Sequence, residues 1–305
     1  MTVQSSRSRD SFRQPSDIAA GAPEWSPDAY VNASGYRFVD LDSDTLPGLR
    51  LAVLNECSRL GIRGSVLLST EGINVMLCGS ESAIADVQGW LYSHRAFVGL
   101  RLKYSRSSRV TYNRMLVKIK KEIIPVGDSS VRPTNTTGRY ISPEDLRLWL
   151  DEDRDFVLLD TRNDFEVDLG TFRGATDLRL ESFRSISSRL NRLQSEDRRR
   201  PVVAFCTGGI RCEKATPLVM RMGFDNVYQL EGGILNYFER CGDRHFEGEC
   251  FVFDKRVSVN AELRETGTTQ CYACQNVLTE ADQESPDYVY EVSCPYCAGD
   301  RSVDR

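Results

Sequence analysis

Cys206 stands in a segment whose residue types could build a nucleophile. Cys206-Thr-Gly-Gly-Ile-Arg-Cys212 follows an apolar run at 201–205 and leads into a stretch with helical spacing. Gly208 and Gly209 allow a tight turn with its N–H groups directed inward, at the positive end of a helix dipole. Such amides stabilise an anion and lower the pKa of a thiol from about 8.5. The pattern predicts a thiolate, or a persulfide, in a loop formed by Cys206, Thr207, Gly208, Gly209, Ile210, Arg211 and Cys212.

Other side chains could support this loop. Asp160 and Arg162 end the apolar run FVLLDTR, and in a parallel sheet they would share an edge with Cys206. They either orient the nucleophile and bind an anionic group, or form a structural ion pair. Cys212 either resolves an oxidised Cys206 as a disulfide or simply packs. The two histidines of the chain lie in no acid–base motif, which is consistent with a preformed thiolate.

Four cysteines near the C-terminus have the spacing of a metal site. Two C-x-x-C pairs, with 19 residues between them, match a four-thiolate zinc site: Cys271, Cys274, Cys294 and Cys297. The alternatives are redox-active dithiols or a site that has lost its metal. We therefore expect a structural zinc, and we find no flavin or haem motif.

The order of elements predicts two folded domains and a small third segment. Residues 1–34 read as a disordered leader, and 35–130 predict a β-α-β-β-α-β domain of the ferredoxin or acylphosphatase type. The stretch 139–243 alternates apolar strands and helices, with Ser142 as N-cap and a helix expected over 180–193, as in a parallel α/β sheet. Residues 244–305 form a Cys-rich segment.

Charge and composition limit the classes of partner that the protein can bind. No apolar run reaches the roughly 20 residues of a membrane helix, and no export signal precedes the ten cysteines, so we expect a cytoplasmic protein with reduced thiols and no membrane contact. The net charge is −5, yet 95–121 contains no acidic residue. This basic run is either a solvated face or a polyanion surface. Its candidate phosphate ligands are Arg114, Lys118, Lys120 and Lys121.

The motifs resemble those of a known family. CTGGIRCEKA, DTRNDFE and YQLEGGI resemble the rhodanese superfamily, and STEGIN with GECFVFDKRVSV is similar to the rhodanese-domain tRNA uridine hydroxylases, from about Tyr36 to Cys297. The resemblance implies a rhodanese-like α/β domain after an acylphosphatase-like one. It also implies an oxidoreductase that converts the wobble uridine of tRNA, in the anticodon, to 5-hydroxyuridine, with molecular oxygen as co-substrate. Cys206 would be its catalytic cysteine.

Three functions follow from these features. The leading function is tRNA hydroxylation. In it, the basic run binds the phosphate backbone of the tRNA, and Cys206 contacts a base that is splayed out of the stack. The second is a rhodanese-type sulfurtransferase that carries a Cys206 persulfide. The third is a regulatory module that binds an anion without turnover. The acid-free run favours the first, because transfer of sulfur to a small molecule does not need it.

Overall fold

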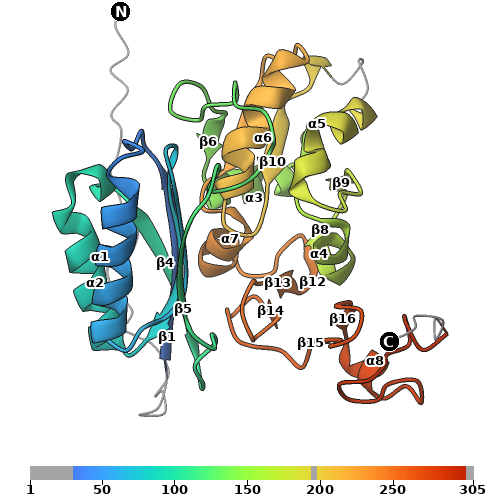
Figure 1. The fold of residues 1–305 in the computed structure, drawn as a ribbon. Coiled ribbons are helices and arrows are strands. Elements are labelled where there is room, and N and C mark those ends of the chain that lie inside the picture. Colours follow the sequence, from blue (N-terminus) through green and yellow to red (C-terminus); the bar gives the residue numbers. More distant parts are fainter. Residues whose placement is uncertain (1–29, 194–197, 300–305) are drawn as a thin grey trace, which may run out of the picture.

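The computed structural model describes residues 30–193 and 198–299, which form two layered domains and a smaller C-terminal segment (Figure 1). The first domain contains β1 (Tyr30–Phe38), α1 (Leu46–Arg59), β2 (Arg63–Ser69), β3 (Gly72–Gly79), α2 (Glu81–Ser93), β4 (Arg101–Ser107) and β5 (Met115–Ile119). Its sheet has the order β4-β1-β3-β2-β5. The predicted order of elements is therefore present, with β5 as an added edge strand.

The two faces of this sheet have different partners. Alternate residues such as Val31, Ile73 and Leu102 point into a core that is covered by α1 and α2. The other side of the sheet carries polar side chains, among them Tyr36 and Lys103, and it lies toward the second domain (Figure 1). The sheet is thus enclosed between its own helices and a neighbouring domain.

The second domain is a parallel sheet with helices around it. Its elements are β6 (Arg139–Ile141), α3 (Pro143–Asp151), β7 (Val157–Asp160), α4 (Asp164–Leu169), β9 (Thr176–Asp177), α5 (Ile186–Arg189), β10 (Val202–Phe205), α6 (Ile210–Arg221), β11 (Val227–Leu230) and α7 (Gly233–Cys241). The order β6-β11-β10-β7-β9 puts β10 in the centre, and Phe205 pairs with Asp160. Ser142 caps α3 as predicted, with its hydroxyl accepting from the Asp145 amide.

The remaining strands are short. They are β8 (Gly170–Phe172), β12 (Phe246–Gly248), β13 (Cys250–Phe251), β14 (Ser258–Val259), β15 (Thr269–Gln270) and β16 (Val277–Leu278), followed by α8 (Glu280–Gln283). β12 pairs with β8, which joins the C-terminal segment to the second domain, and β13 pairs with β14. In the described part of the chain, no helix is both long and apolar enough to cross a membrane.

Two local expectations from the sequence are wrong. The leader was expected to reach residue 34, but Tyr30–Phe38 is strand, and Val31 and Ala33 are buried in the core; residues 1–29 lie outside the described part. The single helix expected over 180–193 is broken into α5 and two 3-10 turns. Here Ser185 and Ser188 donate their hydroxyls to backbone carbonyls three residues earlier, an alternative that competes with a regular helix.

Candidate active site

Cys206 follows the central strand β10 and has no solvent-exposed surface of its own. The next residues turn sharply into α6, with Gly209 as N-cap at φ 98°. A residue with a side chain rarely adopts this left-handed conformation, so the turn depends on glycine. The Gly209 amide donates to Cys206 Sγ at 3.1 Å. The predicted turn of amides around the sulfur is therefore present in this structure.

The first two carbonyls of the loop accept hydrogen bonds from backbone amides of α7. Ile234 N donates to Cys206 O at 2.9 Å, and Leu235 N donates to Thr207 O at 3.1 Å. This contact requires Gly233, since a Cβ at that position would lie 2.3 Å from Cys206 O. The Gly-Gly turn of the YQLEGGI motif thus packs directly on the cysteine loop, a role that the sequence pattern did not indicate.

The surroundings of Cys206 favour its anionic form. Burial alone would raise the pKa of the Cys206 thiol, but the Cys212 thiol, the Arg211 charge and the amides of Arg211 and Gly209 lower that pKa to about 5. Cys212 is affected in the opposite direction. Burial and the nearby Cys206 anion raise the pKa of the Cys212 thiol well above its usual range. Cys206 is therefore the thiolate of the pair, and Cys212 is its neutral donor.

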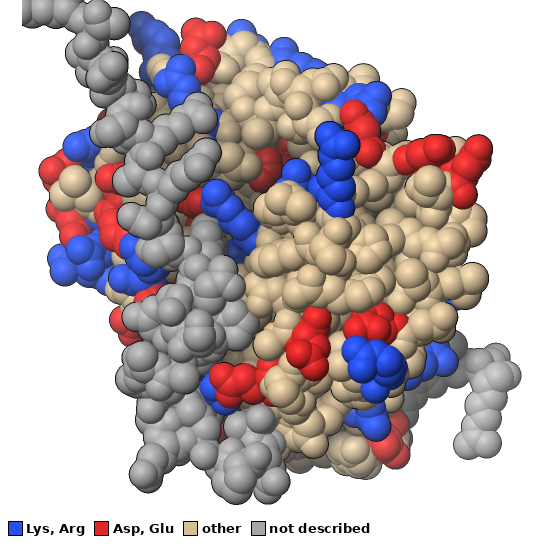
Figure 2. Space-filling view, turned by 90° about the vertical axis from the view of Figure 1, so that its left-hand side faces the viewer, with Lys and Arg blue, Asp and Glu red and all other residues tan. Residues whose placement is uncertain are grey.

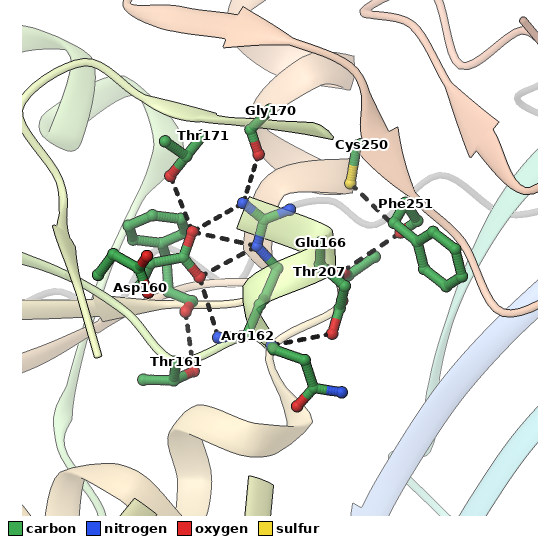
Figure 3. A network of polar contacts seen from close by, with 12 residues as sticks. Asp160, Thr161, Arg162, Glu166, Gly170, Thr171, Thr207, Cys250 and Phe251 are labelled. Atoms are coloured by element: carbon green, nitrogen blue, oxygen red, sulfur yellow. Dashed lines mark hydrogen bonds and ion pairs between the residues drawn. The ribbon is translucent and has the colours of Figure 1, made fainter. Parts of the chain in front are cut away.

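Arg211 is fixed beside the loop by a buried carboxylate. Its guanidinium donates twice to Glu166, at 2.5 and 2.7 Å, and the Thr207 hydroxyl donates to Glu166 at 3.3 Å. Figure 3 shows Thr207 between Glu166 and Phe251. Glu166 on α4 was not identified from the sequence, although it stands in the quoted motif DTRNDFE.

Asp160 and Arg162 form a structural ion pair rather than a binding surface. Arg162 Nη2 lies 2.7 Å from Asp160 Oδ2, and both side chains are fully buried. The guanidinium also donates to Gly170 O at 2.6 Å, and Thr171 donates to Asp160 (Figure 3). Neither residue lines the cavity described next. Of the two roles considered for this pair, the structure therefore has the structural ion pair. Its hydrogen bonds to Gly170 and Thr171 link β7 to β8.

A cavity of about 410 Å³ lies above Cys206 and is shared by three parts of the chain. The cysteine loop contributes Cys206 and Arg211, and the open face of the first sheet contributes Tyr36 and Lys103. The segment 252–263 closes a further side, where Arg256 donates to Ser105 Oγ on β4 at 2.8 Å. The volume is in the range of small-molecule sites, and the cavity lies between domains, where such sites are frequent.

Tyr36 and Lys103 were not recognised as site residues in the sequence. Lys103 appeared there only as one cation of the basic run, and Tyr36 only as part of a strand. The open face of an acylphosphatase-type sheet gives no signal of which domain will cover it. Two-residue alternation on β1 and β4 would have assigned both side chains to that face, but not to a catalytic cavity.

The basic run is divided between two edges of the first sheet. Lys118, on β5, and the exposed Arg114, Lys120 and Lys121 that flank this strand lie at one edge, whereas Arg101 and Lys103 lie on β4 at the other. Figure 2 shows the outer face of this domain, where Lys and Arg side chains stand among Asp and Glu. The described residues on this face therefore do not form a surface of one sign.

The C-terminal cysteines converge as the sequence predicts. The four sulfurs of Cys271, Cys274, Cys294 and Cys297 lie within 4.8 Å of one another. Three sulfur–sulfur distances are 3.5, 3.7 and 4.0 Å. Zinc–sulfur bonds of about 2.3 Å in a tetrahedron separate the sulfurs by about 3.8 Å. The arrangement therefore fits a divalent metal held by four thiolates.

The chain is similar to two described domain families and to many curated proteins. Residues 30–123 match the "UPF0176 acylphosphatase like domain" and residues 142–240 match the "Rhodanese-like domain", which confirms the predicted fold class. The "tRNA uridine(34) hydroxylase" of Cupriavidus necator is 43% identical over 89% of this chain and 97% of that protein. The protein of the same name from Ralstonia nicotianae is 44% identical over 88% of this chain and 96% of its own length. With this identity and coverage, the chain belongs to the tRNA uridine(34) hydroxylase family.

Proposed function

We propose that this protein is a tRNA-modifying oxidoreductase that hydroxylates uridine 34, with Cys206 as its catalytic nucleophile. The observation that carries the proposal is the position of the Cys206 sulfur, at the base of a cavity that two domains share. A base inside a stacked anticodon cannot reach a buried sulfur, so the uridine has to swing out into the cavity. The relatives named above carry the same activity in their names.

The chemistry of a thiolate fits a uracil ring. C6 of uracil is the β-carbon of an unsaturated carbonyl, so addition of the Cys206 thiolate there makes C5 an enolate carbon. That carbon can react with molecular oxygen to give a hydroperoxide, and reduction to the alcohol consumes two electrons and two protons and releases water. Loss of the C5 proton and of the thiolate restores the ring. The external reductant supplies the two electrons, and Cys206 is regenerated.

Mass spectrometry of nucleosides tests this function. We expect tRNA incubated with the protein, a reductant and ¹⁸O₂ to yield 5-hydroxyuridine that contains one labelled oxygen. A thiolated uridine would instead assign the protein to the sulfurtransferases, and an unmodified tRNA that still binds would favour the anion-binding module. A tRNA substrate supports the expected cytoplasmic location.

The β5 edge of the first sheet is the proposed binding site for the phosphate backbone of tRNA. Lys118, Lys120 and Lys121 are exposed together, and ammonium groups release counterions when they contact phosphates. We expect the variant with all three changed to Gln to bind tRNA more weakly and to lower the slope of log K against log salt by about two. The control changes the exposed Arg154, Arg173 and Arg184 of the rhodanese domain to Gln. Equal slopes for both triple variants would contradict the proposal.

The four-cysteine cluster is the proposed zinc site. A metal there would hold a segment that is stabilised in the described residues by only one small buried cluster, around Leu278. We expect elemental analysis to find about one zinc per chain, and Cys294→Ser to lose it together with the thermal stability of this segment. Cys241→Ser, which changes a cysteine outside the cluster, is the control. A metal-free, folded wild-type protein would contradict the assignment.

A further inference from the structure

One peptide unit in the cysteine loop forms hydrogen bonds through both its N–H and its C=O group. The amide of Gly209 donates to Cys206 Sγ at 3.1 Å, and the carbonyl of Gly208, in the same peptide unit, accepts from Lys103 Nζ at 2.6 Å. Because a trans peptide directs its N–H and C=O to opposite sides, the two bonds hold this unit in a single orientation. Lys103 is therefore connected to the sulfur through one rigid group.

The bond from Lys103 differs from the others that fix the loop. The carbonyls of Cys206 and Thr207 are held by backbone amides of α7, within the same domain. The Gly208 carbonyl is held by a side chain on β4, in the first domain. Since glycine stands on both sides of this peptide, the unit could otherwise rotate and turn its carbonyl towards the sulfur. A carbonyl in that position would repel a thiolate, whereas an amide stabilises it.

Lys103 also differs from the arginines near the site in whether a carboxylate neutralises its charge. Arg211 is neutralised by Glu166, and Arg162 by Asp160. Among the described residues, no carboxylate forms an ion pair with Lys103. Its ammonium group donates to the Gly208 carbonyl and lies 5.8 Å from the centroid of the Tyr36 ring. The lysine thus brings a positive charge that the neighbouring pairs do not cancel.

Several titratable groups share this environment. Those that act directly on Lys103 or Cys206 are Arg101 on β4, Tyr36 on β1, Arg211, Cys212 and Glu213 on α6, and Glu231 before α7. Two more groups act on these neighbours: Tyr140 on β6 acts on Tyr36, and Glu166 on α4 acts on Arg211. Burial lowers the pKa of Lys103 to about 8, although the charges of Cys206, Glu213 and Glu231 act in the opposite direction. The ammonium form therefore predominates at neutral pH.

The contact depends on the docking of the two domains. Tyr36 donates to Glu213 at 2.9 Å, and Tyr140 donates to the same carboxylate oxygen at 2.7 Å. The next residue, Lys214, is buried and lies 2.8 Å from Glu71 and 2.7 Å from Glu122. Two consecutive residues of α6 thus hold the first domain, and with it Lys103, against the cysteine loop.

We propose that Lys103 is a positioning residue of the active site. By holding the Gly208 carbonyl, it keeps the Gly209 amide on the Cys206 sulfur, so that ionisation of this sulfur depends on the docked first domain. The first domain is then part of the catalytic machinery as well as a partner for tRNA. The inference deepens the proposed function and rests on it for the identity of the reaction, but not for the state of the thiol.

The test measures how fast iodoacetamide alkylates Cys206 between about pH 4 and about pH 9, with peptide mass spectrometry to assign the site. We expect Lys103→Met to raise the apparent pKa of Cys206 by about one unit and to slow alkylation severalfold at about pH 5, with an unchanged rate at high pH. Lys103→Arg retains a cationic donor and is expected to restore most of the wild-type profile. Arg63→Met, which removes an exposed cation of the same domain on β2, should match the wild type.

The outcomes are separable from those of the proposed function. If Lys103→Met does not fold, Lys103→Leu, which likewise removes both the hydrogen-bond donor and the charge, carries the same comparison. In the hydroxylation assay at about pH 6, where Cys206 of the variant is partly protonated, Lys103→Met should lower kcat while tRNA binding stays unchanged. A wild-type alkylation profile in the folded Met or Leu variant overturns the inference, whether or not the protein hydroxylates tRNA. A shifted profile in a protein that leaves tRNA unmodified supports the inference and removes the proposed function instead.

Discussion

Replacing Cys206 with Ser is expected to abolish 5-hydroxyuridine formation. The serine hydroxyl fits the same space, but it does not ionise near neutral pH, so the loop amides have no anion to stabilise. Loss of a nucleophile typically reduces turnover by at least about a thousandfold, which takes the product below detection. The measurement is nucleoside mass spectrometry of tRNA from a strain whose own copy of the gene is deleted and replaced by the variant.

The control for this variant is Cys241→Ser. Cys241 lies at the end of α7, outside both the cavity and the four-cysteine cluster, and should tolerate the change with full activity. Binding of tRNA by Cys206→Ser should equal that of the wild type, which separates lost chemistry from lost folding. Retention of 5-hydroxyuridine in the Cys206→Ser strain would exclude Cys206 as the nucleophile.

Replacing Gly233 with Ala is expected to disable the enzyme through the geometry of the loop alone. The added Cβ would lie 2.3 Å from Cys206 O and 2.7 Å from Thr207 O, so the loop or α7 must move. Displacement of a reacting group by about 1 Å can cost on the order of a hundredfold in rate. We expect a loss of that size in hydroxylation, measured as the initial rate of product formation.

Gly242→Ala is a matched control for this variant. Gly242 lies at the other end of α7 with φ 70°, against 68° for Gly233, but no atom lies within 4 Å of an added Cβ. Both variants place an alanine at a positive φ, at a cost of about 1–3 kcal/mol, and only Gly233→Ala collides with the cysteine loop. Equal activities in the two variants would show that the contact between α7 and the loop does not position Cys206.

The sequence predicted those parts of the site that depend on local pattern. An apolar strand, two glycines and a helix in succession determine the path of the Cys206 loop, because each follows from residues within one short segment. The four C-terminal cysteines likewise converge because each pair occupies one tight turn. Short apolar runs likewise located β7, β10 and β11 of the second domain.

The contacts between domains could not be predicted in this way. Lys103 and Gly208 are 105 residues apart, and their hydrogen bond exists only because the open sheet face meets the rhodanese domain. The start of β1 was missed because Asn32, Ser34 and Gly35 interrupt its apolar pattern, and pairing with β3 and β4 outweighs that composition. The ion pair of Asp160 and Arg162 was one of two alternatives, and only burial distinguishes them.

The ionisation of Cys206 in the wild-type protein tests the central claim most directly. Its rate of alkylation, followed by peptide mass spectrometry as a function of pH, should stay constant from alkaline pH down to about pH 6 and fall to half near the expected pKa of about 5. A rate that declines below about pH 8.5, as for free cysteine, would contradict the stabilised thiolate on which this account of the active site depends.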